Sequence, residues 1–132
     1  MEQKVRISEI ASHGDARGSS HSLPAEALNF LGGVADVYLA STAPGAIRGN
    51  HYHVRKRQVL VLLPGTAWSI HWDQGEGTVV QHRSFDGNGA VMVSISPGAS
   101  QAIRNDGNLP LWLVVCSSAS YDPTTVVARK VI

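Results

Sequence analysis

The stretch GAIRGNHYHVRKRQVLVLLPG, residues Gly45 to Gly65, decides how the rest of the chain is interpreted. It places His51 and His53 two residues apart, so on an extended strand both side chains leave the same face. Gln58 follows five residues later and begins an apolar run that ends at the turn dipeptide Pro64–Gly65. Two imidazoles on one face, backed by a second strand, can form either a metal site or a proton-transfer pair.

The remainder of the chain predicts an all-β fold. Short apolar runs alternate with turns rich in Gly, Asp and Asn, such as Asp73–Gly77 and Asp86–Gly89. Leu23 to Phe30 is the one stretch with a helical pattern, and it is short enough that we expect little from it. There is no internal repeat and no linker, so residues 1–132 are predicted to form a single domain, a double-sheet jelly roll.

Composition predicts a soluble, cytoplasmic protein with no membrane partner. Apolar residues make up 43% of the chain, yet no run approaches the length that spans a bilayer, and the sequence MEQKVRIS lacks the apolar core of a signal peptide. The one cysteine, Cys116, excludes an intrachain disulfide and lies in an apolar run. We therefore expect it to be a small buried hydrophobe.

Charge is unevenly distributed, although the net charge is only +1. No Asp or Glu occurs between Val37 and Trp72, and that interval holds the four cations Arg48, Arg55, Lys56 and Arg57. The cluster is either a solvated basic loop or a field that attracts an anionic ligand such as a sugar nucleotide. Nucleic acid is not expected, because the cluster is small and lacks interleaved exposed aromatic residues.

Two runs, Gln58–Leu63 and Leu109–Cys116, are apolar on both faces of the expected strands. One face of a small antiparallel barrel usually meets water. The pattern therefore predicts that a second copy covers the outer face, as in a homodimer. Burial under another part of the same chain is the alternative.

The spacing of the histidine stretch resembles the first cupin motif, here at residues 45–65, with Gln58 in place of the usual glutamate. The second cupin motif is similar to residues 97–105, which begin with Pro97–Gly98 and end at Asn105. There Gln101 occupies the position of the third histidine. The resemblance implies the cupin fold, a double-stranded β-helix.

Longer segments narrow the resemblance to RmlC-like cupins, the dTDP-4-dehydrorhamnose epimerase-like group. The segments DARG (15–18), DVYLASTAPGAIRGNHYH (36–53) and SPGASQAIRN (96–105) occur in the order that this group shows. PGAIRGNHYH, followed much later by Tyr121-Asp122-Pro123, also resembles the zinc-binding C-terminal cupin domain of capsular polysaccharide UDP-sugar reductases. The pattern His-x-His followed by Gln58 resembles instead that of the dTDP-4-keto-6-deoxyhexose ketoisomerases, which work without metal. The resemblance covers roughly Asp15 to Pro123.

The ketoisomerase resemblance implies an acid–base site without a cofactor. The residues that it implicates are catalytic His51, His53 and Tyr38, and substrate-binding Arg48, Arg17, Gln58 and Gln101. The capsular-enzyme resemblance implies a divalent ion (Zn, Mn, Fe or Ni) held by His51, His53, Gln58 and Gln101. Amide oxygens bind such ions weakly and add no charge. We therefore expect a site without a cofactor, and a bound divalent metal is the alternative.

Three functions therefore stay open, and the sequence leaves undecided whether the protein is an enzyme. The first is acid–base isomerisation or epimerisation of a nucleotide-linked keto-deoxysugar by the two histidines. The second is a non-catalytic cupin that binds a sugar or another small molecule. The third is a metal-dependent cupin enzyme with a weakened site of two histidines and two glutamines.

Overall fold

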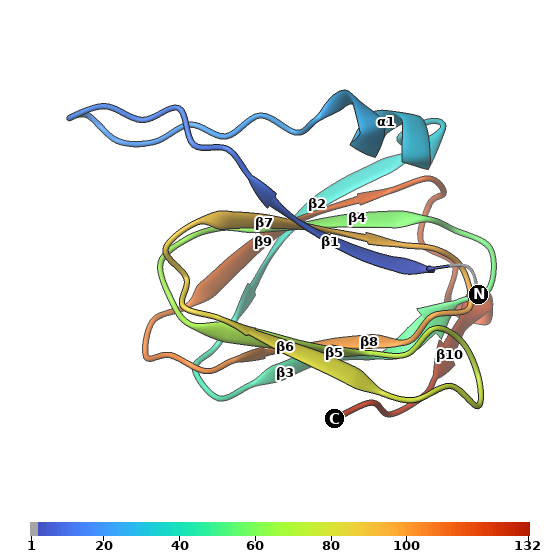
Figure 1. Cartoon of the computed structure of the whole chain (residues 1–132). Coiled ribbons are helices and arrows are strands. Elements are labelled where there is room, and N and C mark those ends of the chain that lie inside the picture. Colours follow the sequence, from blue (N-terminus) through green and yellow to red (C-terminus); the bar gives the residue numbers. More distant parts are fainter. Residues whose placement is uncertain (1–2) are drawn as a thin grey trace.

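A computed structural model describes residues 3–132 as two antiparallel sheets that face each other (Figure 1). The upper sheet has the strand order β1 (Val5–Ile10), β7 (Ala90–Ile95), β4 (Gln58–Leu62), β9 (Leu111–Ser117) and β2 (Asp36–Thr42). The lower sheet has the order β10 (Val126–Ala128), β3 (Ile47–His53), β8 (Gln101–Asn105), β5 (Trp68–Trp72) and β6 (Gln81–Phe85). A short helix, α1 (Ala25–Leu31), and a 3₁₀ turn, η1 (Pro123–Thr125), complete the chain. The all-β jelly-roll prediction is confirmed.

The core lies between the two sheets and follows from the two-residue period of the strands. Leu60 and Leu62 of β4 point toward the lower sheet, and Trp68 and Ile70 of β5 are fully buried opposite them. Trp68 stacks on Phe85 with ring centroids 4.3 Å apart, which holds β5 against β6. This packing leaves His71 on the opposite face of β5, as the alternation predicts.

Helix α1 covers the outer face of β4, so our expectation of little from this stretch was wrong. Ala27 and Leu31, one helical turn apart, pack on Val59 and Val61, together with Cys116, which is buried as predicted. Burial under the same chain therefore explains the two-sided apolarity of Gln58–Leu63. No helix in the described part of the chain is long and apolar enough to cross a membrane.

Part of the upper sheet remains uncovered in the single chain. Val37 and Leu39 of β2, and Trp112 of β9, are each at least half exposed. They share one outer face, because Leu39 pairs with Val114 and Ser41 pairs with Trp112. The predicted homodimer stays a prediction, which light scattering on the purified protein can test.

Candidate functional site

A β-bulge in β3 determines which side chains enter the site. Gly49 pairs with Ala102 of β8, whereas His51 pairs with the next residue back, Gln101, so Asn50 is an extra residue. Asn50 takes a left-handed conformation with φ of 60°. In a regular strand, residues three apart point to opposite faces; the extra residue turns Arg48 and His51 to the same inner face.

The bulge requires glycine at position 49. Its φ is +109°, and a Cβ there would lie 2.9 Å from Cα of Ala102 and closer still to the carbonyl oxygen of Gln101. We predict that Gly49→Ala lowers the free energy of unfolding by about 3 kcal/mol, measured by urea denaturation. Gly45→Ala is the matched control, since Gly45 also has positive φ but open space around it. Equal losses in the two variants would contradict the close approach of β3 and β8.

Two adjoining hollows open beside the bulge, where β2 faces β3. The Arg48 hollow, of about 260 Å³, is lined by Arg48, Gln101 and apolar residues of β8 and β9. The Lys56 hollow, of about 470 Å³, is lined by Lys56, His53, Asp36 and Tyr121. Both hollows also share a wall made of Tyr38, His51 and Gln58. The structure thus brings together six of the seven predicted site residues.

The two imidazoles face one another, as the spacing predicts. Their ring centroids are 5.1 Å apart and their planes are inclined by 70°. Burial, then the charge of Lys56 and then His51, lowers the pKa of His53 from 6.5 to about 4. Burial is also the first cause that lowers the pKa of His51. Both rings are therefore uncharged at neutral pH and can accept a proton.

The lowered pKa of His53 predicts a loss of stability in mild acid. Between pH 6.5 and about 4 the unfolded chain binds a proton at this residue and the folded chain does not, so protonation favours unfolding. The free energy of unfolding should fall across that window by about 2 kcal/mol, measured by urea denaturation at stepped pH. The fall should shrink in His53→Gln, and an identical pH profile in that variant would contradict the assignment.

Tyr38 and Arg48 supply a proton donor and a fixed cation. Burial, and secondarily the charge of Asp36, raises the pKa of Tyr38, so its hydroxyl stays protonated. Arg48 donates from Nε to the carbonyl oxygen of Ser41 at 2.9 Å. Among the described residues no other protein partner bonds this guanidinium, so its terminal nitrogens can bind an anion in the Arg48 hollow.

The donor set does not fit a zinc ion or a similar divalent ion. Among residues 3–132 no group of three or more His, Cys, Asp or Glu side chains could hold a metal. Gln58 uses Nε2 to donate to Oγ of Ser117 at 3.1 Å, and Gln101 leaves a buried Oε1 without a partner. Two imidazoles with two amide oxygens add no negative charge, and the Lys56 ammonium would repel a cation.

Lys56 is a site residue that the sequence did not single out. Only 5% of its surface is exposed, it makes no ion pair with any described residue, and its Nζ lies 5.7 Å from the ring centroid of Tyr121. In the sequence it was one of three consecutive cations in a loop, where no strand period indicates which side chain turns inward. A buried cation beside neutral imidazoles favours an anionic ligand.

Arg17 is the predicted site residue that the structure does not bring to either hollow. It lies in the turn between the paired residues Asp15 and Gly18, within the segment between β1 and α1 that projects from the sandwich (Figure 1). Its guanidinium pairs with Asp15 at 2.6 Å, and the side chain is 89% exposed. A contact between Arg17 and a ligand stays a prediction.

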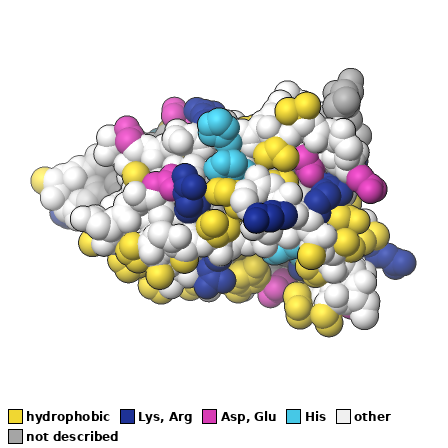
Figure 2. Space-filling model, turned by 90° about the horizontal axis from the view of Figure 1, so that it is seen from below, with side chains coloured by type: hydrophobic (Ala, Val, Ile, Leu, Met, Phe, Trp, Pro, Cys, Tyr) yellow, Lys and Arg dark blue, Asp and Glu magenta, His cyan; other side chains and the backbone are white. Residues whose placement is uncertain are grey.

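The outer face of the lower sheet carries a second pair of neighbouring histidines, His71 and His82. Figure 2 views the molecule from this side and shows Lys, Arg and His side chains interspersed with apolar ones. His71 of β5 pairs with His82 of β6, and their rings stack with centroids 5.3 Å apart. These two histidines lie outside both hollows, so they provide internal controls for experiments on His51 and His53.

The sequence model of the polysaccharide biosynthesis C-terminal domain family matches residues 13–126. The spore coat polysaccharide biosynthesis protein SpsL of Bacillus subtilis is 24% identical over 123 residues, which is 90% of this chain and 82% of SpsL. The match to the family model includes the bulge and every lining residue of the two hollows.

Solved structures show that the fold is the RmlC-like cupin jelly roll. ChmJ, a 3′-monoepimerase from Streptomyces bikiniensis in complex with dTDP-quinovose, matches with a TM-score of 0.78 and 24% identity, over 93% of this chain and 68% of ChmJ. A 3,4-ketoisomerase from Helicobacter canadensis matches with a TM-score of 0.71 and 20% identity, over 96% of this chain and 91% of that one. The RmlC epimerase of Mycobacterium tuberculosis matches with a TM-score of 0.74 and 18% identity, over 93% of this chain and 67% of that one.

Proposed function

Because this chain belongs to the polysaccharide biosynthesis C-terminal domain family, we propose that it isomerises or epimerises a nucleotide-linked keto-deoxysugar. One observation carries the proposal: His51, in the wall shared by the two hollows, and His53, which lines the Lys56 hollow, are uncharged and have ring centroids 5.1 Å apart. Neutral imidazoles can take a proton from carbon and return it. The epimerase and ketoisomerase neighbours support this class of substrate.

The reaction that this site supports best moves a ketone to the neighbouring carbon. One imidazole removes the proton from the carbon beside the carbonyl, and the C–H electron pair forms the double bond of an enediol. The carbonyl oxygen takes a proton from the Tyr38 hydroxyl. The neighbouring hydroxyl then returns a proton to Tyr38 while an imidazolium protonates the former carbonyl carbon, so the second carbon becomes the ketone and no atom is gained or lost.

Arg48 and Lys56 suit the charge of such a substrate. A nucleotide sugar carries a diphosphate, and each of the two cations lines one of the two hollows that share the wall of Tyr38, His51 and Gln58. Arg48 is already anchored through Nε, so it can bind an oxygen with little further loss of side-chain freedom. In an epimerase the same residues would return the proton to the opposite face of the same carbon.

The test is a panel of dTDP- and UDP-linked 4-keto-6-deoxysugars, assayed with and without a strong chelator. We expect turnover that the chelator leaves unchanged, and purified protein whose transition-metal content matches that of His51→Ala. Turnover that the chelator abolishes and one metal restores would replace the proposal with a metal-dependent enzyme. Stabilisation by ligand, about 2.7 kcal/mol at a hundredfold excess over Kd, without turnover would identify a binding protein.

A further inference from the structure

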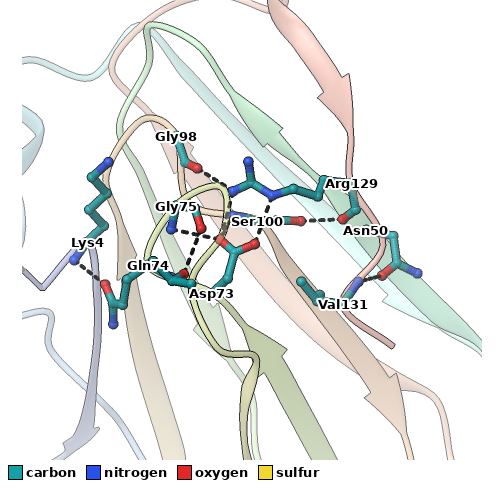
Figure 3. A network of polar contacts seen from close by, with 10 residues as sticks. Lys4, Asn50, Asp73, Gln74, Gly75, Gly98, Ser100, Arg129 and Val131 are labelled. Carbon is teal, nitrogen blue, oxygen red and sulfur yellow. Dashed lines mark hydrogen bonds and ion pairs between the residues drawn. The ribbon is translucent and has the colours of Figure 1, made fainter.

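Arg129 lies at the centre of a partly buried polar network that includes Asp73, Gly98 and Ser100 (Figure 3). It follows β10, whose last residue, Ala128, pairs with His51. Its Nε and one terminal nitrogen donate to the two carboxylate oxygens of Asp73, both at 2.8 Å. Asp73 is only 4% exposed and the Arg129 side chain 21%, so this two-pronged ion pair is partly shielded from solvent and fixes the guanidinium.

Asp73 is itself held in place by the loop before β8. Its Oδ1 accepts from the backbone N–H groups of Gly75 and Ser100 at 3.0 and 2.9 Å. Ser100 in turn donates from Oγ to the carbonyl oxygen of Arg129 at 2.5 Å. The carboxylate therefore joins the β5–β6 turn, the β7–β8 turn and the segment after β10 into one unit.

Three contacts of Arg129 lead to residues that flank the histidines. Its backbone N–H donates to the carbonyl oxygen of Asn50 at 3.0 Å, and its guanidinium lies 4.3 Å from the ring centroid of Tyr52. A terminal nitrogen also donates to the carbonyl oxygen of Gly98 at 2.5 Å. The N–H of Gly98 donates to the carbonyl oxygen of His53 at 2.9 Å, so this contact reaches the second histidine.

The residues after Arg129 form hydrogen bonds with Asn50, the extra residue of the bulge. Oδ1 of Asn50 accepts from the backbone N–H groups of Val131 and Ile132 at 2.8 and 3.2 Å. Asn50 is the residue in the left-handed conformation, which costs energy unless local bonds compensate. The conformation that turns His51 inward is thus held from outside the site.

We propose that Arg129, oriented by Asp73, is a positioning residue for the histidine pair. It holds the strand at Asn50, Tyr52 and, through Gly98, at His53, and it lines neither hollow. The effect on the order of the rings does not depend on the proposed function. The effect on turnover rests on it.

The first test measures ring order by ¹³C relaxation of the histidine side chains, with no substrate present. In Arg129→Gln we expect the order parameters of the His51 and His53 rings to fall to about 0.6 or below, from values near those of rigid backbone. His71 and His82 should not change. Arg104→Gln is the matched control, because it removes an arginine paired with Asp106 on the outer face of the same sheet.

The second test uses turnover once a substrate is found. In Arg129→Gln we expect kcat to fall at least about tenfold while KM changes less than twofold, because misplaced catalytic groups slow the chemical step. Arg129→Lys should recover part of the rate. If the wild type turns over no keto-sugar, the proposed function fails and the relaxation test still decides the positioning role.

Folded Arg129→Gln with His51 and His53 rings as ordered as in the wild type would overturn the proposal. If Arg129→Gln does not fold, Asp73→Asn takes its place, since it keeps the shape of the side chain and removes the charge. It should show the same selective loss of ring order, and unchanged rings in folded Asp73→Asn would overturn the proposal equally.

Discussion

Replacing His51 with Asn is expected to lower kcat by about 10²- to 10⁴-fold, the range that one general base contributes. The variant should still bind the nucleotide part of the substrate, because Arg48 and Lys56 remain in the two hollows. His53→Asn should lose a comparable factor, and the double variant should lose little more, because the proposed mechanism uses the two rings as a unit. The measurement is initial rate at saturating substrate, beside nucleotide affinity by calorimetry.

His71→Asn is the matched control for this experiment. It removes an imidazole from the outer face of the lower sheet, in a pair that resembles the site pair in its centroid distance. We expect it to keep the wild-type rate. A His51→Asn variant that keeps its rate would remove the histidine pair from the chemistry.

Replacing Arg48 with Gln is expected to raise the Kd for the nucleoside diphosphate about tenfold, since a hydrogen bond to a charged group contributes about 1.5 kcal/mol and Arg48 is exposed. The guanidinium is anchored to Ser41, so its free edge is already oriented toward the Arg48 hollow. Calorimetric titration with dTDP at fixed ionic strength measures the change. Arg104→Gln changes net charge by the same amount outside the hollows, and equal weakening in the two variants would contradict a direct contact.

Counting along the strands accounts for the fold and for the histidine pair. The two-residue period placed His51 and His53 on one face, and the jelly roll followed from strand lengths and turns. The same counting would send Arg48 to the opposite face. Its charge and the resemblance placed it at the site, and the bulge at Asn50 provides the physical reason.

Other features depend on contacts that no local pattern records. Lys56 lies in a loop, where a charged side chain is expected to be exposed, yet it is buried. The buried carboxylate of Asp73 pairs with Arg129, which is 56 positions away in the chain. Helix α1 was underestimated because propensity says little about a seven-residue helix, whereas the apolar outer face of β4 stabilises it through Ala27 and Leu31.

The two glutamines are the substitutions that set this site apart from a metal-binding cupin. Gln58 is oriented by Ser117, and neither it nor Gln101 brings a negative charge to the histidines. Both imidazoles are uncharged at neutral pH, and the charge of Lys56 is one of the causes that lower their pKa. Acid–base chemistry on an anionic substrate is what this combination favours.

The central claim is that the histidine pair moves a proton between carbon and solvent-exchangeable groups. The most direct measurement is deuterium incorporation from D₂O into dTDP-4-keto-6-deoxyglucose and related keto-sugars, followed by NMR in the presence of chelator. We predict incorporation at the carbon beside the ketone with the wild-type protein and none above background with the His51→Asn/His53→Asn double variant. No incorporation by the wild type across the panel, or equal incorporation by both proteins, would contradict the account.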